Sequence, residues 1–326
     1  MKKNVVVIGG AGYVGVELVS MLLAKNYNVT VFDLFIYGDN LPENKNLKKI
    51  KGDMRDVQNL EEVIKGNDIV IHLACISNDP SFDLDPDLGK KINFDFFEPL
   101  VKISKDNGIS RFIYASSSSV YGLKDEKDTN EESSLKPLTD YSKYKAMCEE
   151  VLLKHGDNNF VSTIIRPATV CGYSKRQRFD LVVNLLTNLG YNKNLITVFG
   201  GDQLRPNIHI YDMCRVYIKI LETESSIVRD QIFNAGYENK PVKELAEMVK
   251  ETLNKDVKII KERTDDNRSY HITSQKIKKI LNFETKKNIK NAIEDLHEAF
   301  NKKLFKDPLS NEMYFNIKRM KSINLV

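Results

Sequence analysis

A glycine-rich turn near the start of the chain is the feature that most constrains its fold. Residues 5–8 are an apolar, β-branched run typical of a buried strand, and residues 16–24 follow a helical pattern. Between them stand Gly9, Gly12 and Gly15, in a G-x-x-G-x-x-G spacing. A buried strand that turns this tightly into a helix predicts a βαβ unit, with residues 28–32 as its second strand.

Each glycine has a separate role if such a turn binds a dinucleotide. The first permits the sharp bend, the second lets the backbone approach a pyrophosphate, and the third lets the helix pack against the strand. The free N–H groups at the start of the helix, beside Tyr13 and Val14, would face the phosphates. The alternative is a tight turn that binds nothing.

Asp33 stands at the end of the second strand, 18 residues after Gly15. A carboxylate at this distance can bind the 2′-hydroxyl of an adenosine ribose, and it repels the 2′-phosphate of NADP. No arginine in residues 34–40 could accept that phosphate. The predicted cofactor is therefore NAD.

Strands and helices continue to alternate through the first half of the chain. A weak strand at residues 47–51 and stronger strand patterns at 69–73, 111–115 and 161–165 alternate with helical patterns at 57–65, 88–107 and 142–155. This order predicts an α/β fold with a doubly wound parallel sheet, as in a Rossmann domain. We expect an NAD-binding domain at residues 1–168, to which 208–235 return. A smaller C-terminal α/β substrate lobe would comprise 169–207 and 236–305, and 306–326 would form a tail.

Composition excludes several classes of protein. The 326 residues are 41% hydrophobic and 29% charged, with a net charge of +4 that is well mixed, so neither a disordered chain nor a nucleic-acid-binding surface is expected. The four cysteines lie far apart, which argues against a disulfide scaffold or a metal site. With no long apolar run and no clean secretory signal, we expect no membrane partner and a cytoplasmic location.

Tyr141 and Lys145 form a Y-x-x-x-K pair within a predicted helix, where positions i and i+4 share one face. A free phenol has a pKa of about 10, too high for a base at neutral pH. A nearby ammonium and the nicotinamide cation would both favour the phenolate. Tyr141 could then take a proton from a sugar hydroxyl while hydride leaves the same carbon. The alternative is an ordinary surface pair.

These motifs together resemble the extended short-chain dehydrogenases, in the branch of NAD-dependent nucleotide-sugar epimerases and dehydratases. The resemblance covers residues 4 to about 300. It includes Gly52-Asp53-Met54-Arg55-Asp56, similar to a family stretch whose first acid meets the adenine, and His72-Leu73-Ala74 after a strand. The further cofactor contacts that it implies are Asp53, Met54, Leu73, Ala74, Asn93 and Lys145.

The resemblance also assigns the serine-rich loop after residues 111–115. Ser117 has the position of the family's Ser or Thr that holds the reacting hydroxyl. Where the 4,6-dehydratases carry Thr-Asp-Glu, this chain has Ser117-Ser118-Ser119. No side chain of this triplet can donate or accept a proton near neutral pH, so we do not expect dehydration.

Arginines of the smaller lobe are the expected contacts to a sugar nucleotide, because a guanidinium fork bonds two phosphate oxygens at once. Arg205 and Arg268 resemble the two family arginines that bind the diphosphate, while Arg176 and Arg178 are expected to open the first helix of the lobe. Thr169 replaces an asparagine that contacts the nucleotide in the epimerases. The implied substrate-binding residues are Ser117, Ser118, Thr169, Arg178, Arg205 and Arg268.

The resemblance implies oxidation at C4 of a nucleoside-diphosphate sugar. The chain as a whole looks most like the GDP-heptose 4-dehydrogenases of bacterial capsule biosynthesis. The main alternative is a 4-epimerase of the UDP-hexose type, followed by a 4,6-dehydratase and a non-catalytic regulator that senses a dinucleotide. By analogy with the family we expect a homodimer or homotetramer, paired through residues 88–107 and 142–155.

Overall fold

A computed structural model describes residues 3–123, 128–264 and 269–325 of the chain. Its largest sheet has strand order β10-β6-β5-β4-β1-β2-β3, with every neighbouring pair parallel. These strands are β1 (Asn4–Ile8), β2 (Asn28–Asp33), β3 (Leu47–Lys51), β4 (Ile69–His72), β5 (Arg111–Ala115), β6 (Val161–Pro167) and β10 (Gln231–Ala235). The order runs outward in both directions from β1, and neighbouring strands that diverge leave a crevice at their carboxyl ends.

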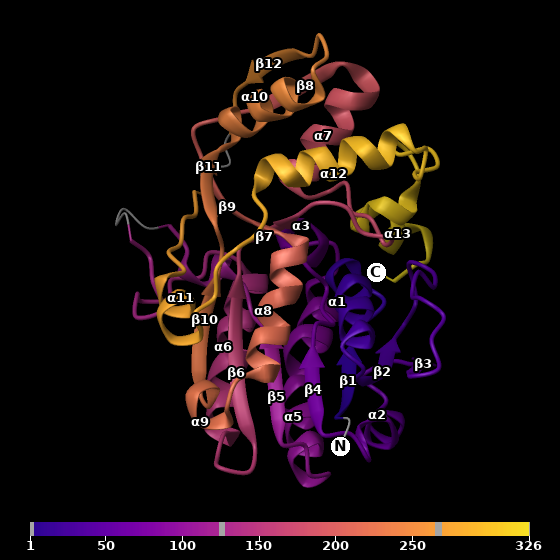
Figure 1. The fold of residues 1–326 in the computed structure, drawn as a ribbon, viewed down its shortest axis with the longest axis vertical. Coiled ribbons are helices and arrows are strands. Elements are labelled where there is room, and N and C mark those ends of the chain that lie inside the picture. Colours follow the sequence, from indigo (N-terminus) through magenta and orange to yellow (C-terminus); the bar gives the residue numbers. More distant parts are fainter. Residues whose placement is uncertain (1–2, 124–127, 265–268, 326) are drawn as a thin grey trace.

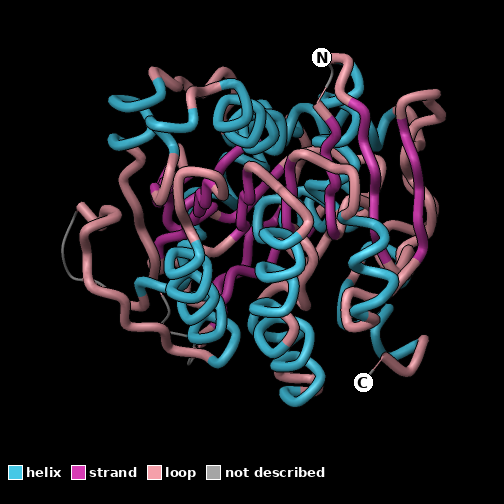
Figure 2. Tube along the Cα trace, turned by 90° about the horizontal axis from the view of Figure 1, so that it is seen from below, coloured by secondary structure: helices cyan, strands magenta, loops and turns pink. Residues whose placement is uncertain are grey.

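Helices cover both faces of this sheet, as Figure 2 shows. On one face α1 (Tyr13–Ala24) packs against α8 (Ile210–Glu222), and on the other α5 (Phe97–Asp106) packs between α2 (Val57–Ile64) and α6 (Asp140–His155). The apolar strand residues are buried on both faces and join two separate cores. The expected doubly wound α/β fold is therefore confirmed.

A smaller lobe lies beyond the carboxyl ends of the parallel strands (Figure 1). Its two small sheets have the orders β11-β9-β7 and β12-β8. The strands are β7 (Thr169–Cys171), β8 (Leu195–Phe199), β9 (Leu204–His209), β11 (Glu238–Pro241) and β12 (Lys258–Glu262); the helices are α7 (Val182–Lys193), α10 (Val242–Leu253) and α12 (Ile289–Asn301). Apolar residues of α7, α10 and α12 form the core of this lobe.

The single long helix predicted at residues 88–107 is wrong. The structure has α4 (Pro86–Lys90), a π-helical turn η1 (Lys91–Asp95) and then α5, preceded by the short α3 (Asp79–Phe82). Pro99 explains the break, because proline lacks the N–H that would bond to the carbonyl of Asp95, and its ring crowds that carbonyl. Proline is tolerated only in the first turn of a helix, which is where α5 has it.

The C-terminal residues, which showed no strong pattern, dock on the first domain. They include η3 (Glu312–Tyr314) and α13 (Asn316–Ser322). Met320 and Leu325 pack against the core on the α5 face of the sheet, and Arg319 Nε donates to the carbonyl of Ile36 at 2.6 Å. A shorter α11 (Gln275–Leu281) contacts β10, and α9 (Ser225–Val228) contacts β6. Within the described residues, no helix is long and apolar enough to cross a membrane.

Candidate active site

A cavity of about 560 Å³ lies at the carboxyl ends of the parallel strands, where the smaller lobe meets the first domain. The loops after β1, β2, β4, β5 and β6 form its floor. Residues 176–182, Arg205 and the C-terminal tail close it from the other side. In open parallel α/β sheets, ligands bind at this edge.

The glycine turn is packed so tightly that side chains would not fit at two of its positions. Gly9 has φ +82°, and a Cβ there would lie 2.5 Å from the backbone nitrogen of Ala74. A Cβ on Gly15 would lie 2.6 Å from the carbonyl oxygen of Gly10. Gly12, which precedes α1, lines the cavity. The start of α1 is thereby held against the cavity, as a pyrophosphate requires.

Asp33 lies beside this turn with its carboxylate fixed by two backbone amides. Ala11 N donates to one oxygen at 3.0 Å, and Phe35 N donates to the other at 2.8 Å. Burial raises the pKa of Asp33, and the two amides oppose that rise. A fixed carboxylate lining the cavity, next to an open helix N-terminus, fits the adenosine half of a dinucleotide.

Most of the other predicted cofactor residues also line the cavity, namely Tyr13, Val14, Asp53, Met54, Leu73, Ala74 and Lys145. Burial would raise the pKa of Asp53, but its ion pair with Arg55, at 2.6 Å, holds the pKa below its usual value. Asn93 is different. Its side chain bonds both the N–H and the C=O of Ile76, at 2.8 and 2.9 Å, and does not line the cavity. Asn93 therefore braces the loop after β4.

The three predicted catalytic residues meet at one wall of the cavity. Lys145 Nζ donates to the carbonyl of Ala115 at 2.7 Å and lies 5.9 Å from the centre of the Tyr141 ring. Ser117, which follows β5 and caps the turn η2 (Ser118–Tyr121), acts on the Tyr141 phenol as a hydrogen-bonding group that lowers its pKa. The i, i+4 spacing on α6 thus brings the ammonium and the phenol together, as expected.

The pKa of Tyr141 is raised strongly, chiefly because the phenol is buried. Cys75 and Asp79 raise it further, whereas Ser117 and Arg178 lower it. The protein groups alone therefore hold Tyr141 as the neutral phenol at neutral pH. The lowered pKa that we expected is not produced by these groups.

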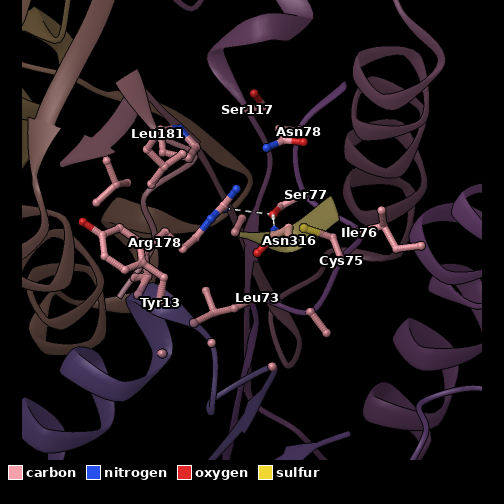
Figure 3. Close-up of a pocket in the computed structure, with 18 of the residues that line it drawn as sticks. Tyr13, Leu73, Cys75, Ile76, Ser77, Asn78, Ser117, Arg178, Leu181 and Asn316 are labelled. Carbon is pink, nitrogen blue, oxygen red and sulfur yellow. Dashed lines mark hydrogen bonds between the residues drawn. The ribbon is translucent and has the colours of Figure 1, made fainter. Parts of the chain in front are cut away.

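The arginines contribute unequally to the cavity. Figure 3 shows Arg178 reaching into it, where Nη1 bonds Ser77 Oγ at 3.0 Å. Arg176 is 4% exposed, and its guanidinium lies 3.6 Å from the centre of the Tyr37 ring. Both arginines precede α7, so the prediction that they open the first helix is wrong, because the helix begins only at Val182.

The remaining predicted substrate residues are distributed as follows. Ser117, Ser118, Thr169 and Arg205 line the cavity. The Arg205 guanidinium lies 5.7 Å from the centre of the Tyr270 ring and donates to the carbonyl of Leu204 at 3.0 Å. Arg268 lies outside the described residues.

Sequence reasoning missed Asn316, a residue of the C-terminal tail that contributes to the cavity. Asn316 accepts from Arg176 Nη2 at 2.8 Å and donates to Ser77 Oγ at 3.1 Å, and its backbone N–H bonds Asp180. Figure 3 shows it beside Ser77, which is also the partner of Arg178. Met320 and Leu325 line the cavity as well. No periodic pattern in the tail could have indicated these contacts.

Two histidines, His72 and His209, have contacts that indicate a structural role. His72 is buried among Phe97, Phe112 and Tyr114, and burial lowers its pKa to about 3. His209 bonds Asp295 at 3.0 Å. The described residues include no cluster of His, Cys, Asp and Glu that could hold a metal ion.

Comparison with known proteins gives a family match over most of the chain. A family model described as the NAD dependent epimerase/dehydratase family matches residues 5–236. Human sterol-4-alpha-carboxylate 3-dehydrogenase (decarboxylating) is 31% identical over 205 residues, which cover 60% of this chain and 53% of that protein. The chain thus spans about half the length of this relative.

Two further proteins match nearly the whole chain. A putative UDP-arabinose 4-epimerase of Arabidopsis thaliana is 25% identical over 87% of this chain and 76% of its own length. The solved structure of MoeE5, in complex with UDP-glucuronic acid and NAD, is 26% identical with a TM-score of 0.80. That alignment covers 92% of this chain and 99% of MoeE5.

Proposed function

The chain belongs to the NAD dependent epimerase/dehydratase family, and on this premise we propose that it oxidises C4 of a nucleoside-diphosphate sugar to a 4-keto sugar. The observation that carries the proposal is the meeting of Tyr141, Lys145 and Ser117 at one wall of the cavity, which the glycine turn and Asp33 also line. NAD is the cofactor of this family, and the residues around Asp33 fit its adenosine half.

The protein's own part in this reaction is to hold the sugar hydroxyl and move its proton. Ser117 would orient the C4 hydroxyl toward the Tyr141 oxygen, which takes the proton. Lys145, fixed by the carbonyl of Ala115, supplies positive charge beside the phenol as it loses its own proton. When bound, the nicotinamide of NAD accepts the hydride from C4. Arg178 and Arg205, from the smaller lobe, would hold the diphosphate.

Elimination of water after C4 oxidation needs a general acid and a general base near the sugar, and the serine triplet supplies neither. Ser117, Ser118 and Ser119 carry neither a general acid nor a general base that works near neutral pH. Four carboxylates of the described residues line the cavity, and none belongs to this triplet. Asp33 and Asp53 lie among the expected cofactor contacts, Asp180 pairs with Arg178 at 2.8 Å, and Asp79 accepts a hydrogen bond from Thr139 at 2.5 Å. We therefore favour oxidation without dehydration.

We propose GDP-heptose as the first substrate to test, with release of the 4-keto product. This choice rests on the resemblance of the loop Ser117–Ser119 and of residues 166–174 to the GDP-heptose 4-dehydrogenases. A 4-epimerase is the second candidate, and the docked tail favours it. Asn316, Met320 and Leu325 cover the cavity, and an enzyme that returns the hydride to the same sugar has no need to release its cofactor.

The test is incubation of NAD-loaded protein with GDP-heptose, GDP-mannose, UDP-glucose and dTDP-glucose. A product two hydrogens lighter, together with an equal amount of reduced nicotinamide, supports the 4-dehydrogenase. A product of unchanged mass with inverted C4 supports the epimerase, while loss of water contradicts our argument from the serine triplet. No change with any sugar would reject C4 oxidation of these substrates.

Tyr141→Phe is the variant that links the chemistry to the site. We expect it to lower turnover by a factor of about 100 or more, because it removes the group that accepts the proton. Tyr144→Phe is the matched control. Tyr144 lies on the same helix and stacks on Phe94, with ring centres 5.4 Å apart. Near-native turnover of Tyr141→Phe would refute the mechanism.

A further inference from the structure

A row of side-chain hydroxyls leads away from Tyr141, and the mechanism above uses only its first member. Ser117, which lowers the pKa of the Tyr141 phenol, has its Oγ 2.8 Å from Ser119 Oγ. Ser142 Oγ lies 2.9 Å from Ser119 Oγ and 2.9 Å from Thr139 Oγ1. Thr139 then donates to Asp79 Oδ1 at 2.5 Å.

This row connects three separate elements of the first domain. Ser117 and Ser119 lie at the start of the turn η2, Thr139 and Ser142 at the start of α6, and Asp79 in α3. Ser142 is 1% exposed, whereas Asp79 is half-buried and lines the cavity. The row therefore runs from the wall of the catalytic site, through the interior, to a carboxylate that water can reach.

We propose that Ser117, Ser119, Ser142 and Thr139 form a proton relay between the Tyr141 phenol and the Asp79 carboxylate. The proposal rests on the proposed function, because it gives the proton of the sugar hydroxyl a destination. Each of the four hydroxyls can pass a proton to its neighbour, because a hydroxyl both donates and accepts a hydrogen bond.

The relay answers a difficulty that the burial of Tyr141 creates. In the ligand-free protein burial favours the protonated phenol, which must lose its own proton before it can accept another. Cys75, Arg178 and Lys145 also face this phenol, and the Lys145 ammonium has no free electron pair with which to accept a proton. The row of hydroxyls offers a series of hydrogen-bonded acceptors that ends on an ionisable group.

The proton balance of the step is as follows. The hydrogen of the C4 hydroxyl moves to Tyr141 Oη as the phenol hydrogen moves to Ser117 Oγ. Each hydroxyl in turn passes its own hydrogen to the next, and a new O–H bond forms on Asp79, which later loses that proton to water. The hydride of C4 reduces NAD, so the sugar loses two hydrogens and becomes a ketone.

The hydrogen bonds of the row do not all point outward at rest. Ser142 donates toward Ser119, while Thr139 donates toward Asp79. Outward transfer therefore requires the Ser119 and Ser142 hydroxyls to turn about their C–O bonds. Such a turn moves only hydrogens and leaves the oxygen positions unchanged.

Two of the hydroxyls also have a structural role, which decides the choice of variants. Thr139 caps α6 by accepting from Ser142 N, and Ser117 caps the turn η2 by accepting from Ser119 N. Ser119 serves neither helix as a cap and is half-buried. Ser119→Ala therefore breaks the row with little structural cost, and Ser119→Thr restores a hydroxyl. Ser81→Ala is the control, because the Ser81 hydroxyl is buried near Asp79 and has no partner among the described residues.

The first test needs no substrate. In NAD-loaded protein labelled with ¹³C-tyrosine, exchange of the Tyr141 hydroxyl hydrogen is measured from the ¹³Cζ signal in equal H₂O and D₂O, with Tyr141→Phe for assignment. We expect Ser119→Ala to slow this exchange about tenfold or more, while Ser119→Thr and Ser81→Ala exchange as the native protein does. Equal exchange in Ser119→Ala would overturn the relay, since the proton would then leave through cavity water.

The second test uses turnover of GDP-heptose and separates a relay from a simple charge effect. The Asp79 charge raises the pKa of Tyr141, so a purely electrostatic role predicts that Asp79→Asn reacts faster at neutral pH. The relay predicts a kcat about tenfold lower for Asp79→Asn and Ser119→Ala, with KM unchanged and activity restored in Ser119→Thr. A faster Asp79→Asn enzyme would refute the relay. Slowed exchange without oxidation of any sugar would retain the relay and reject the proposed function.

Discussion

Replacement of Arg176 by methionine tests whether this arginine is held in the cavity for a ligand. Arg176 is 4% exposed, and burial lowers its pKa to about 10, which corresponds to about 3 kcal/mol against the charged side chain in the folded protein. The guanidinium remains charged at neutral pH, so this cost applies in full. Its Nε and Nη1 atoms have no hydrogen-bond partner among the described residues.

Favourable contacts of Arg176 nearly offset that cost in the ligand-free protein. Stacking on Tyr37, at 3.6 Å, contributes about 1 to 2 kcal/mol, and the bond to Asn316 contributes about 1.5 kcal/mol. We therefore expect Arg176→Met to change the free energy of unfolding by less than about 1 kcal/mol. Methionine has a similar length and is apolar, so it can retain the packing against Tyr37.

The effect on NAD binding should be much larger. Arg176 and Asp33 both line the cavity, and the positive charge of Arg176 lowers the pKa of Asp33. If Nε and Nη1 each donate one bond to bound NAD, their loss costs about 3 kcal/mol, or about 100-fold in affinity. Thermal unfolding and calorimetric titration with NAD measure the two quantities. A strongly destabilised variant with native NAD affinity would refute this reasoning and make Arg176 a structural residue.

Three further predictions follow from buried charges and from the cofactor site. Arg166 is 3% exposed and forms an ion pair with Glu149 at 2.6 Å, which Glu149→Gln removes. This variant should lower the free energy of unfolding, measured by urea titration, by about 3 kcal/mol. A change of less than about 1 kcal/mol would contradict a stabilising role for this ion pair. Burial lowers the pKa of His72 to about 3, whereas a histidine in the unfolded chain has a pKa of about 6.5. The free energy of unfolding should therefore fall by about 1.4 kcal/mol for each pH unit as the pH drops from 6.5 toward 3. His72→Leu should flatten that slope, and an unchanged slope would exclude His72 as its source. Asp33→Ser should reduce the ratio of NAD affinity to NADP affinity about tenfold in equilibrium binding, because a carboxylate no longer repels the 2′-phosphate. An unchanged ratio of affinities would show that Asp33 does not select the cofactor.

The elements of the first domain were predictable because their signals are local. A β-branched run buried on both faces and a glycine turn define β1 and α1, and the i, i+4 rule brings Lys145 beside Tyr141. The same local reasoning failed at residues 88–107. There, one proline within an apolar helical pattern was enough to divide the segment into separate helical turns.

Contacts between distant residues could not be predicted from the sequence. Asn316 and Ser77 are 239 positions apart, and nothing in the pattern around either residue indicates that they meet. The hydroxyl row has the same origin, since Thr139 and Asp79 approach only when α3 packs against α6. For Asn93, the family resemblance implied a cofactor contact, whereas the structure shows both ends of its amide bonded to the backbone of Ile76.

The most direct test of the central claim follows the hydrogen at C4. NAD-loaded protein is incubated with GDP-heptose and with UDP-glucose, each carrying deuterium at C4, and the nicotinamide is analysed by mass. We predict reduced nicotinamide that carries the deuterium with at least one of these sugars, and none with Tyr141→Phe. Failure of both sugars to transfer deuterium would contradict C4 oxidation, and so would equal transfer by Tyr141→Phe.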